Sequence, residues 1–302
     1  MKHSIVCLGE ILWDSMPAGL FPGGAPYNVA YHLKKLGENV KIISRTGNDD
    51  LGREAIRRAE LNGISAEYIQ TDSSLPTGFV EVYLDGKGVP QYNIKKPAAW
   101  DEIVLSEDVK KILNEADAVV FGTLAQRSET SRNTIQWIKH ADCLKVLDLN
   151  LRPPDDSEKV IHSSLEIADL VKLNDDELNV LRNQYQLPEE LKSAAETLSE
   201  MFKLNAVCIT CGGDGAFFLN SGEWTECSGN RITVADTVGA GDAFLAVLVS
   251  GYLNNTPPEM LLNLANHLGA WVATQNGSTP HYSVDSISGI KNLSLYPEKI
   301  ID

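Results

Sequence analysis

Short apolar runs alternate with longer amphipathic stretches along most of the chain. The apolar runs include SIVCLG at 4–9, VKIIS at 40–44, DAVVFG at 117–122, LKVLDLN at 144–150, ADLVKLN at 168–174 and AVCIT at 206–210. Helix-like stretches such as PYNVAYHLKKLG at 26–37, DLGREAIRRAELNG at 50–63 and SRNTIQWIKHA at 131–141 follow the first three. Strand, helix and strand in succession are typical of a parallel sheet covered on both faces. The pattern predicts an α/β fold with a mostly parallel sheet.

One region departs from this pattern. In TGFVEVYLDGKGVPQYNIKK at 77–96, Val80, Val82 and Leu84 alternate with side chains of the other face, and a turn is expected near Asp85 and Gly86. This predicts an antiparallel flap. No long linker sets it apart, so we expect an extension of the same domain, near the carboxyl ends of the parallel strands where ligands bind.

Composition and charge narrow the function classes. The 302 residues are 43% hydrophobic, which is enough for an ordinary core, and their formal net charge of -15 argues against nucleic acid and anionic lipid as partners. Five cysteines lie mostly in apolar runs, as reduced core thiols do. No stretch approaches the ~20 apolar residues of a membrane span, and the N-terminus lacks the pattern of a signal peptide. We expect a cytoplasmic protein.

The stretch DTVGAGDAF at 236–244 places two glycines and a carboxylate at the start of a helix-like apolar run. Gly239, Ala240 and Gly241 would leave backbone N–H groups free at the positive end of the helix dipole, which makes an anion hole. Asp242 would then lie within reach of a hydroxyl that attacks a phosphoryl group held there. Two alternatives remain open from the residues alone: a carboxylate that only stabilises the dipole, and a dinucleotide-binding loop.

Two motifs resemble the signatures of one family. DTVGAGDAF resembles the C-terminal signature of the PfkB (ribokinase-like) carbohydrate kinases, and GGAPYNVAYHLKKLG at 23–37 is similar to their N-terminal signature. The resemblance implies a ribokinase-like three-layer α/β/α sandwich with a mostly parallel central sheet and a small β-sheet lid. It further implies a single domain over residues 1–302, with lid segments at about 10–22 and 77–100.

The resemblance also implies roles for individual residues. Asp242 matches the catalytic base, and Gly239, Ala240 and Gly241 match the anion hole. The residues matching the sugar site are Asp14, Gly23, Gly24 and Asn28. The departures from the pattern are Tyr27, where a small residue is common, and the bulky Trp13, and either could reshape the sugar pocket.

Further motifs match the nucleotide and metal sites. Asn174 and Glu177 in KLNDDE match residues that organise Mg²⁺ and the nucleotide phosphates, although from the residues alone they form a helix capping box. The positions matching the ATP site are Thr210, Gly212, Gly215 and Asn266. The resemblance further implies a monovalent cation, such as K⁺, near Asp236 and Gly277.

LDLNLRPP at 147–154 carries a D-x-N-x-R-P pattern at a predicted strand end. It resembles the fructokinase-like branch of the family, which implies that Arg152 lies near the transferred phosphate or the substrate. A structural salt bridge in the loop is the alternative interpretation of Arg152.

The resemblance implies an ATP-dependent sugar kinase, with fructose as the expected sugar because GGAPYNVA, GEILWD and KKPAAWDEI look most like bacterial fructokinases. A 2-keto-3-deoxygluconate kinase is the alternative enzyme. A non-catalytic sugar sensor and a dehydrogenase are alternatives of other classes. The presence of Asp242, Gly239 and Gly241 disfavours the sensor, which would not need a base or an anion hole. The missing third glycine of G-x-G-x-x-G disfavours the dehydrogenase. A homodimer formed through the lid is a further expectation.

Overall fold

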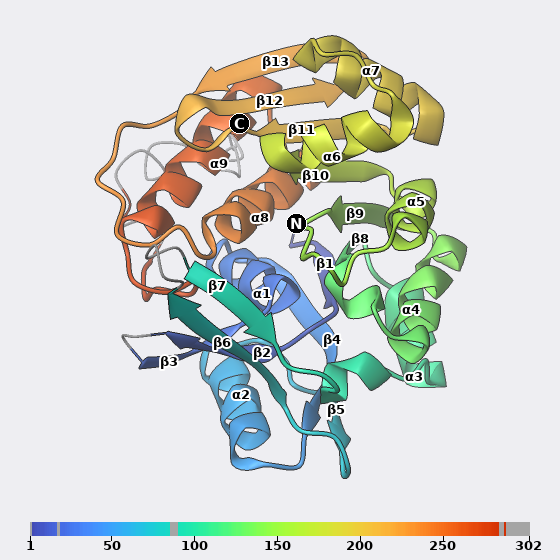
Figure 1. Cartoon of the computed structure of the whole chain (residues 1–302), viewed down its shortest axis with the longest axis vertical. Helices are drawn as coiled ribbons and strands as arrows, with labels where there is room; N and C mark the ends of the chain where they lie inside the picture. The colour runs from blue at the N-terminus through green and yellow to red at the C-terminus, as the bar shows by residue number, and fades with distance from the viewer. Residues whose placement is uncertain (1, 17–18, 85–89, 284–286, 288–302) are drawn as a thin grey trace, which may run out of the picture.

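The computed structural model describes residues 2–16, 19–84, 90–283 and 287, and its centre is a nine-stranded sheet (Figure 1). The strand order is β13-β12-β11-β10-β9-β8-β1-β4-β5. In chain order these strands are β1 (Ser4–Leu8), β4 (Asn39–Gly47), β5 (Ile69–Asp72), β8 (Ala118–Gly122), β9 (Leu144–Asp148), β10 (Leu170–Asn174), β11 (Ala206–Thr210), β12 (Gly215–Asn220) and β13 (Glu223–Ser228). Seven neighbouring strands from β11 to β5 pair in parallel, whereas β12 and β13 add an antiparallel edge.

Helices cover both faces of this sheet, so the predicted α/β sandwich is confirmed. One layer contains α1 (Ala25–Lys35), α2 (Asp50–Leu61), α8 (Ala240–Leu253) and α9 (Pro258–Ala273). The opposite layer contains α3 (Glu107–Asn114), α4 (Glu129–Gln136), α5 (Glu158–Ile167), α6 (Asp175–Tyr185) and α7 (Leu191–Phe202). Short 3₁₀ helices lie at Ala99–Glu102, Leu124–Gln126, Trp137–His140 and Gly212–Asp214.

The strand sequences explain why the sheet is buried on both sides. In β1, Ile5 and Cys7 pack into the core beneath α1 and α8, while Val6 and Leu8 pack into the core on the side of α3 to α7. Successive side chains of a strand point to opposite faces, so a strand that is apolar at every position fits between two helical layers. Within the described residues, no helix is long and apolar enough to cross a membrane.

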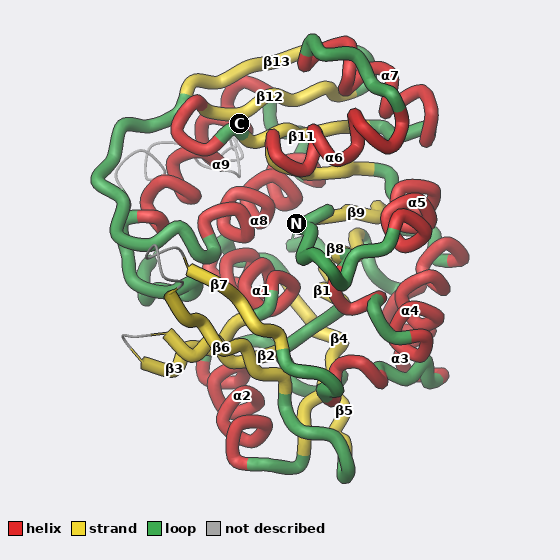
Figure 2. The backbone as a smooth tube through the Cα atoms, viewed as in Figure 1, coloured by secondary structure: helices red, strands yellow, loops and turns green. Residues whose placement is uncertain are grey.

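A second, four-stranded sheet lies beside α1 and α2 (Figure 2). Its order is β3-β2-β6-β7, with β2 (Leu12–Met16), β3 (Gly19–Gly23), β6 (Gly78–Leu84) and β7 (Pro90–Ile94). The strands form two antiparallel pairs that meet where β2 and β6 run parallel. The turn expected near Asp85 and Gly86 lies outside the described residues. Because β3 ends at Gly23, this sheet leads directly into α1.

Candidate active site

The glycine loop before α8 has the geometry that its sequence suggested. Gly239 has a φ of +80°, and a Cβ atom at this position would lie 2.5 Å from the Cα atom of Ser278. Only glycine adopts this backbone and permits this approach without strain. The helix begins at Ala240, so the N–H groups of its first turn have no partner within the helix. Asp242 lies in this first turn with 8% of its surface exposed.

Two buried side chains hold the Asp242 carboxylate. Asn28, in the first helix α1, donates from Nδ2 to Oδ2 of Asp242 at 2.8 Å. Ser278 in turn donates from its hydroxyl to Oδ1 of Asn28 at 2.9 Å. Three segments that are distant in the sequence therefore converge on one carboxylate. Asn28 was expected to bind sugar, and in the structure its amide donates to Asp242 and orients that carboxylate.

Burial, and after it the nearby negative charge of Asp148, raises the pKa of Asp242 to about 6. The hydrogen bond from Asn28 and the positive charges of Lys172 and Arg152 oppose this shift. A carboxylate with a pKa near neutrality remains ionised at pH 7 and is a stronger base than an ordinary aspartate. The environment of Asp242 therefore suits proton abstraction.

A buried ion pair lies directly beneath the glycine loop. Lys172 on β10 donates from Nζ to Oδ1 of Asp148, the last residue of β9, at 3.0 Å. Both residues are buried. A Cβ atom at Gly241 would lie 3.0 Å from Nζ of Lys172, so the ammonium group lies against the loop. This places one positive charge close to the N–H groups of the predicted anion hole.

Asp14 lies on β2 of the second sheet, where Gly23 of the neighbouring strand covers it. A Cβ atom at Gly23 would lie 2.1 Å from Oδ2 of Asp14, so any larger residue would displace the carboxylate. Gly24, with a φ of +103°, then turns the chain into α1. Burial, followed by the negative charge of Asp242, raises the pKa of Asp14 to about 6. Asp14 is therefore close enough to Asp242 for the charge of Asp242 to act on it.

Two bulky residues beside these motifs point elsewhere. Trp13 donates from Nε1 to the carbonyl of Leu51 at 3.0 Å, and the guanidinium of Arg58 lies 4.9 Å from the centre of its ring. Tyr27 is fully buried and also lies near Arg58. Both residues therefore pack toward α2, and Trp13 lies on the face of β2 opposite to Asp14. The bulk of Trp13 is therefore turned away from Asp14, because neighbouring side chains on a strand point to opposite faces.

On the other side of the glycine loop lies a cavity of about 250 Å³. Its lining contains four of the residues expected at the ATP site, Thr210, Gly212, Gly215 and Asn266, together with Ala240 and Gly241 of the predicted anion hole. The loop that follows β13 supplies apolar side chains at the rim, including Ile232 and the 55% exposed Val234. Exposed aliphatic side chains at a cavity mouth are suited to the flat face of a base.

Asn174 and Glu177 form the capping box that the residues alone suggested. Asn174 accepts from the backbone N–H of Glu177 at 2.8 Å, and Glu177 accepts from that of Asn174 at 2.8 Å. The second oxygen of Glu177 accepts from the backbone N–H of Leu151 at 2.9 Å, which ties α6 to the loop containing Arg152. Each oxygen keeps one free lone pair. That arrangement fits a Mg²⁺ ion held through water better than one bound directly.

The loops around Asp236 and Gly277 meet as the resemblance implied. Asp236 accepts from the backbone N–H of Gly277 at 3.2 Å and from that of Val238 at 3.0 Å. The same contact brings the following residue, Ser278, against Gly239. Asp236 therefore fixes the loop that orients Asn28.

Arg152 is exposed, and among the described residues its guanidinium forms no ion pair. The Arg152 guanidinium donates to the carbonyl of Leu151, and its charge lowers the pKa values of Asp14 and Asp242. The structural salt bridge weighed for this loop is absent from the described part of the chain. The positive charge of Arg152 instead opposes the rise in the pKa values of Glu10, Asp14 and Asp242.

The sequence motifs did not indicate three contributors to the site: Ser278, Lys172 and Glu10. Ser278 lies in a loop without a regular pattern, and the GST sequence around it has no specific meaning. Lys172 is a charged residue inside an apolar strand run, LVKLN, and such a position is a signal of a buried ion pair. Glu10 follows the apolar run of β1 and offers the same signal.

A ribokinase-like α/β fold with a buried carboxylate beside a nucleotide-sized cavity is typical of carbohydrate kinases. The chain belongs to the pfkB family of carbohydrate kinases, whose profile matches residues 16–284. The family predicted from the two motifs is thereby confirmed.

Similar proteins cover almost the whole chain. An uncharacterized sugar kinase of Pyrococcus horikoshii is 30% identical over 300 residues, which cover 91% of this chain and 92% of the relative. The fructokinase of Klebsiella pneumoniae is 27% identical over 298 residues, covering 92% of this chain and 95% of that protein.

Solved structures agree with the fold. The crystal structure of the Pyrococcus horikoshii kinase in complex with ATP aligns with a TM-score of 0.81 and 26% identity, over 96% of this chain and 99% of the other. The fructokinase of Xylella fastidiosa with bound ATP has the same TM-score of 0.81 at 21% identity, over 97% and 98% of the two chains, and shows the fold alone.

Proposed function

We propose that this carbohydrate kinase transfers the γ-phosphoryl group of MgATP to a primary hydroxyl of fructose. The observation that best supports this proposal is the position of Asp242. Its carboxylate is buried, is oriented by Asn28, and lies between Asp14 and the nucleotide cavity. Similarity to proteins named fructokinase supports the choice of sugar. The motifs GGAPYNVA and GEILWD support it independently.

In the proposed reaction, Asp14 accepts hydrogen bonds from sugar hydroxyls, and the free N–H of Asn28 donates to another. Asp242 takes the proton of the attacking hydroxyl as the bond to phosphorus forms. The N–H groups after Gly239 then stabilise the charge on the transferred phosphoryl oxygens. Mg²⁺ would neutralise the phosphate charge, with Asn174 and Glu177 holding its waters.

The charges around the acceptor favour a neutral sugar. The negative charge of Asp242 raises the pKa values of Glu10 and Asp14, that of Asp148 raises the pKa of Asp242, and Lys172 is already paired with Asp148. A carboxylate on the acceptor would be repelled by this group. The unpaired Arg152 is the observation that favours the second candidate, 2-keto-3-deoxygluconate, because a guanidinium binds carboxylates bidentately.

The test is ADP release with MgATP against fructose, 2-keto-3-deoxygluconate, ribose, tagatose and adenosine, with Asp242→Asn measured beside the wild type. We expect turnover of fructose, and a loss of ~10²- to 10⁴-fold in kcat for the variant, which keeps the shape and loses the base. Highest kcat/KM for 2-keto-3-deoxygluconate would replace the sugar while keeping the mechanism. Near-normal turnover by Asp242→Asn would remove the proposed base.

A second part of the proposal concerns the oligomeric state of the protein. The outer strands of the second sheet, β3 and β7, have no further strand beside them within the described residues. Such edges pair readily with another chain, so we propose a homodimer through this sheet. Size-exclusion chromatography with light scattering distinguishes the dimer from a monomer of 33.0 kDa.

A further inference from the structure

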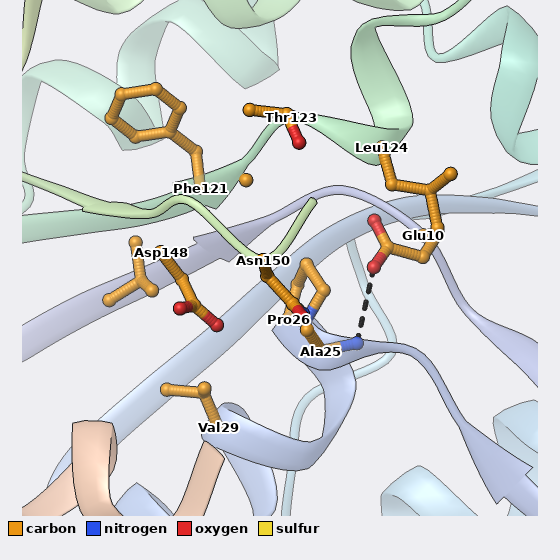
Figure 3. A pocket seen from close by; sticks show the side chains of 11 residues that line it. Glu10, Ala25, Pro26, Val29, Phe121, Thr123, Leu124, Asp148 and Asn150 are labelled. Carbon is orange, nitrogen blue, oxygen red and sulfur yellow. Dashed lines mark hydrogen bonds between the residues drawn. The ribbon is translucent and has the colours of Figure 1, made fainter. Parts of the chain in front are cut away.

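Helix α1 presents different side chains on its two sides. Pro26 and Val29 line a small pocket near the end of β8 (Figure 3). Asn28 and His32, four residues apart, share another side of the helix, and Asn28 is the residue that orients Asp242. All six histidines lie in the described part of the chain, and only His32 is buried. The proposed reaction does not use this buried polar side chain, so its contacts require an explanation.

Both ring nitrogens of His32 form hydrogen bonds to the segment 278–282, which follows α9. Nε2 lies 2.9 Å from the carbonyl oxygen of Ser278, and Nδ1 lies 2.8 Å from the hydroxyl of Tyr282. Burial lowers the pKa of His32 to about 4, so the ring is neutral at pH 7 and carries one proton. A carbonyl oxygen only accepts, so this proton lies on Nε2, and Nδ1 accepts from the Tyr282 hydroxyl. Each bond therefore has one possible direction.

The neighbouring residue of α1 holds the same segment at another point. The hydroxyl of Tyr31 donates to the carbonyl of Pro280 at 2.6 Å. The rings of His32 and Tyr282 also stack, with their centres 5.7 Å apart. Tyr31, His32 and Tyr282 are all buried, so these hydrogen bonds do not compete with bulk water. One side of α1 therefore fixes the backbone of residues 278–282.

These contacts continue to the Asp242 carboxylate. Tyr282 donates to His32, and His32 donates to the backbone carbonyl of Ser278. The hydroxyl of Ser278 then donates to Asn28, whose amide donates to Asp242. Every donor in this series is directed toward the carboxylate. Buried networks whose members are paired favour one arrangement of those members, so the backbone position of Ser278 decides where its hydroxyl meets Asn28.

We propose that His32, supported by Tyr282, is a positioning residue for the base. It fixes the backbone of Ser278 and, through Ser278 and Asn28, the orientation of the Asp242 carboxylate. His32 itself contacts neither the sugar nor ATP in this proposal. The inference rests on the proposed function, because it takes Asp242 as the base.

The first experiment measures steady-state kinetics of full-length variants with fructose and MgATP. His32→Leu keeps an apolar side chain and removes both hydrogen bonds, so kcat should fall by ~10-fold with KM for ATP unchanged. The amide nitrogen of glutamine can still donate to the carbonyl of Ser278, so kcat of His32→Gln should stay within ~3-fold of wild type. A His32→Gln variant as impaired as His32→Leu would overturn the proposal.

Tyr282→Phe provides a milder test that preserves the packing. It keeps the ring and removes only the hydroxyl that donates to His32, so kcat should fall by ~3-fold. This variant also carries the test if His32→Leu does not fold. An unchanged kcat in Tyr282→Phe would contradict the supporting role of that residue.

The pH profile separates positioning from a loss of stability. The hydrogen bond from Asn28 lowers the pKa of Asp242, so a variant that loosens Asn28 should raise this pKa. The acid limb of kcat/KM should therefore move to higher pH in His32→Leu, and by less in Tyr282→Phe. The other charged groups that interact with Asp242 are unchanged in both variants, namely Asp148, Lys172, Arg152, Asp14 and Glu10. A limb that stays in place would overturn the proposal.

A second histidine–tyrosine pair in the chain offers a matched control. Nδ1 of His162 on α5 lies 3.3 Å from the hydroxyl of Tyr185 on α6, in the helical layer on the other face of the central sheet. His162→Leu and Tyr185→Phe should leave kcat and the acid limb unchanged. Equal changes at the two pairs would show a general effect of such substitutions and would overturn the proposal.

A measurement without turnover tests the hydrogen bonds directly. Nitrogen-15 NMR of the full chain labelled at histidine should show His32 neutral at pH 7 with its proton on Nε2, and the signal is identified by its loss in His32→Gln. A proton on Nδ1 would overturn the proposal, because Nε2 could not then donate to Ser278. Near-normal turnover by Asp242→Asn would instead refute the proposed base. Unchanged kinetics of His32→Leu beside an inactive Asp242→Asn would refute this inference alone.

Discussion

The nucleotide half and the acceptor half of the site are built from different kinds of group. The cavity on the nucleotide side is lined by glycines, small residues and aliphatic side chains such as Val234. The acceptor side depends on buried carboxylates, which are held by hydrogen bonds from Asn28 and an ion pair with Lys172. The first half requires space and backbone groups, whereas the second requires particular side chains in particular orientations.

This difference has a consequence for how the two halves respond to substitution. The nucleotide cavity comes from one contiguous part of the chain, residues 210–273. The contact between Asn28 and Asp242 spans 214 positions, and that between Asn28 and Ser278 spans 250. Changes on the acceptor side should therefore be coupled and non-additive, and changes on the nucleotide side should be local.

The largest effect is expected at the boundary between the halves. Gly239→Ala would press a Cβ atom against Ser278 and force a strained φ, which displaces both the N–H groups of the loop and the hydrogen bond to Asn28. We expect kcat to fall by ~10²-fold or more. Gly212→Ala is the control, since its Cβ would meet nothing within 4 Å although its φ is also positive. Equal losses in both variants would show that backbone strain, and not displacement, is responsible.

A smaller effect should follow when only the orientation of the base is disturbed. Ser278→Ala removes the donor to Asn28 and leaves Asp242 intact, so kcat should fall by ~5- to 10-fold, as expected for one buried hydrogen bond. KM for ATP should not change. A double-mutant cycle of Ser278→Ala with Asn28→Ala checks the chain of contacts, and strictly additive losses would contradict it.

The pH profile tests the charges of the acceptor half. Asp242 must be ionised to accept a proton, and its pKa is raised to about 6, so kcat/KM should decline as the pH falls below about 6. Asp148→Asn removes the negative charge that raises this pKa and frees the charge of Lys172, which lowers it. The acid limb should therefore move to lower pH in this variant. A limb that stays in place or moves upward would contradict the assignment.

The pH dependence of stability gives a second measurement on the same half. A carboxyl group with a raised pKa in the folded state stabilises that state most at low pH and loses the contribution as the pH rises. For Glu10 the loss falls between its ordinary pKa of 4.5 and about 7. The melting temperature of Glu10→Gln relative to wild type should therefore increase across this interval and stay level above it. Differential scanning calorimetry at several pH values measures it, and a constant difference would contradict the shift.

The smallest effect is expected on the nucleotide side. Val234→Ser replaces an exposed apolar side chain at the rim of the cavity and should raise KM for ATP by ~3-fold, because only a small apolar contact is lost. KM for the sugar should stay unchanged. Val180→Ser, at a 43% exposed position on α6 that does not line the cavity, is the control and should leave both constants unchanged.

The same contrast explains what the sequence could predict. Glycines such as Gly239 and Gly215 are required by backbone geometry, and that requirement is local, so a short motif reveals it. The strand and helix pattern likewise depends on neighbouring residues, and the parallel sheet was predicted correctly. The partners of Trp13 could not be predicted from its neighbours, because they lie on α2, which begins at Asp50. Ser278 was missed for the same reason, since its partner lies 250 positions away.

The long span of these contacts also bears on the synthesis of the chain. A nascent chain that ends before residue 230 contains Asp14 and Asn28 but has neither Asp242 nor a complete nucleotide cavity. The last strands of the sheet, α8 and the loop that contains Ser278 must be synthesised before Asn28 can bind and orient Asp242. Contacts of such high sequence separation form late in folding. An unfinished chain on the ribosome therefore cannot consume ATP, and the ability to do so arrives together with the finished site.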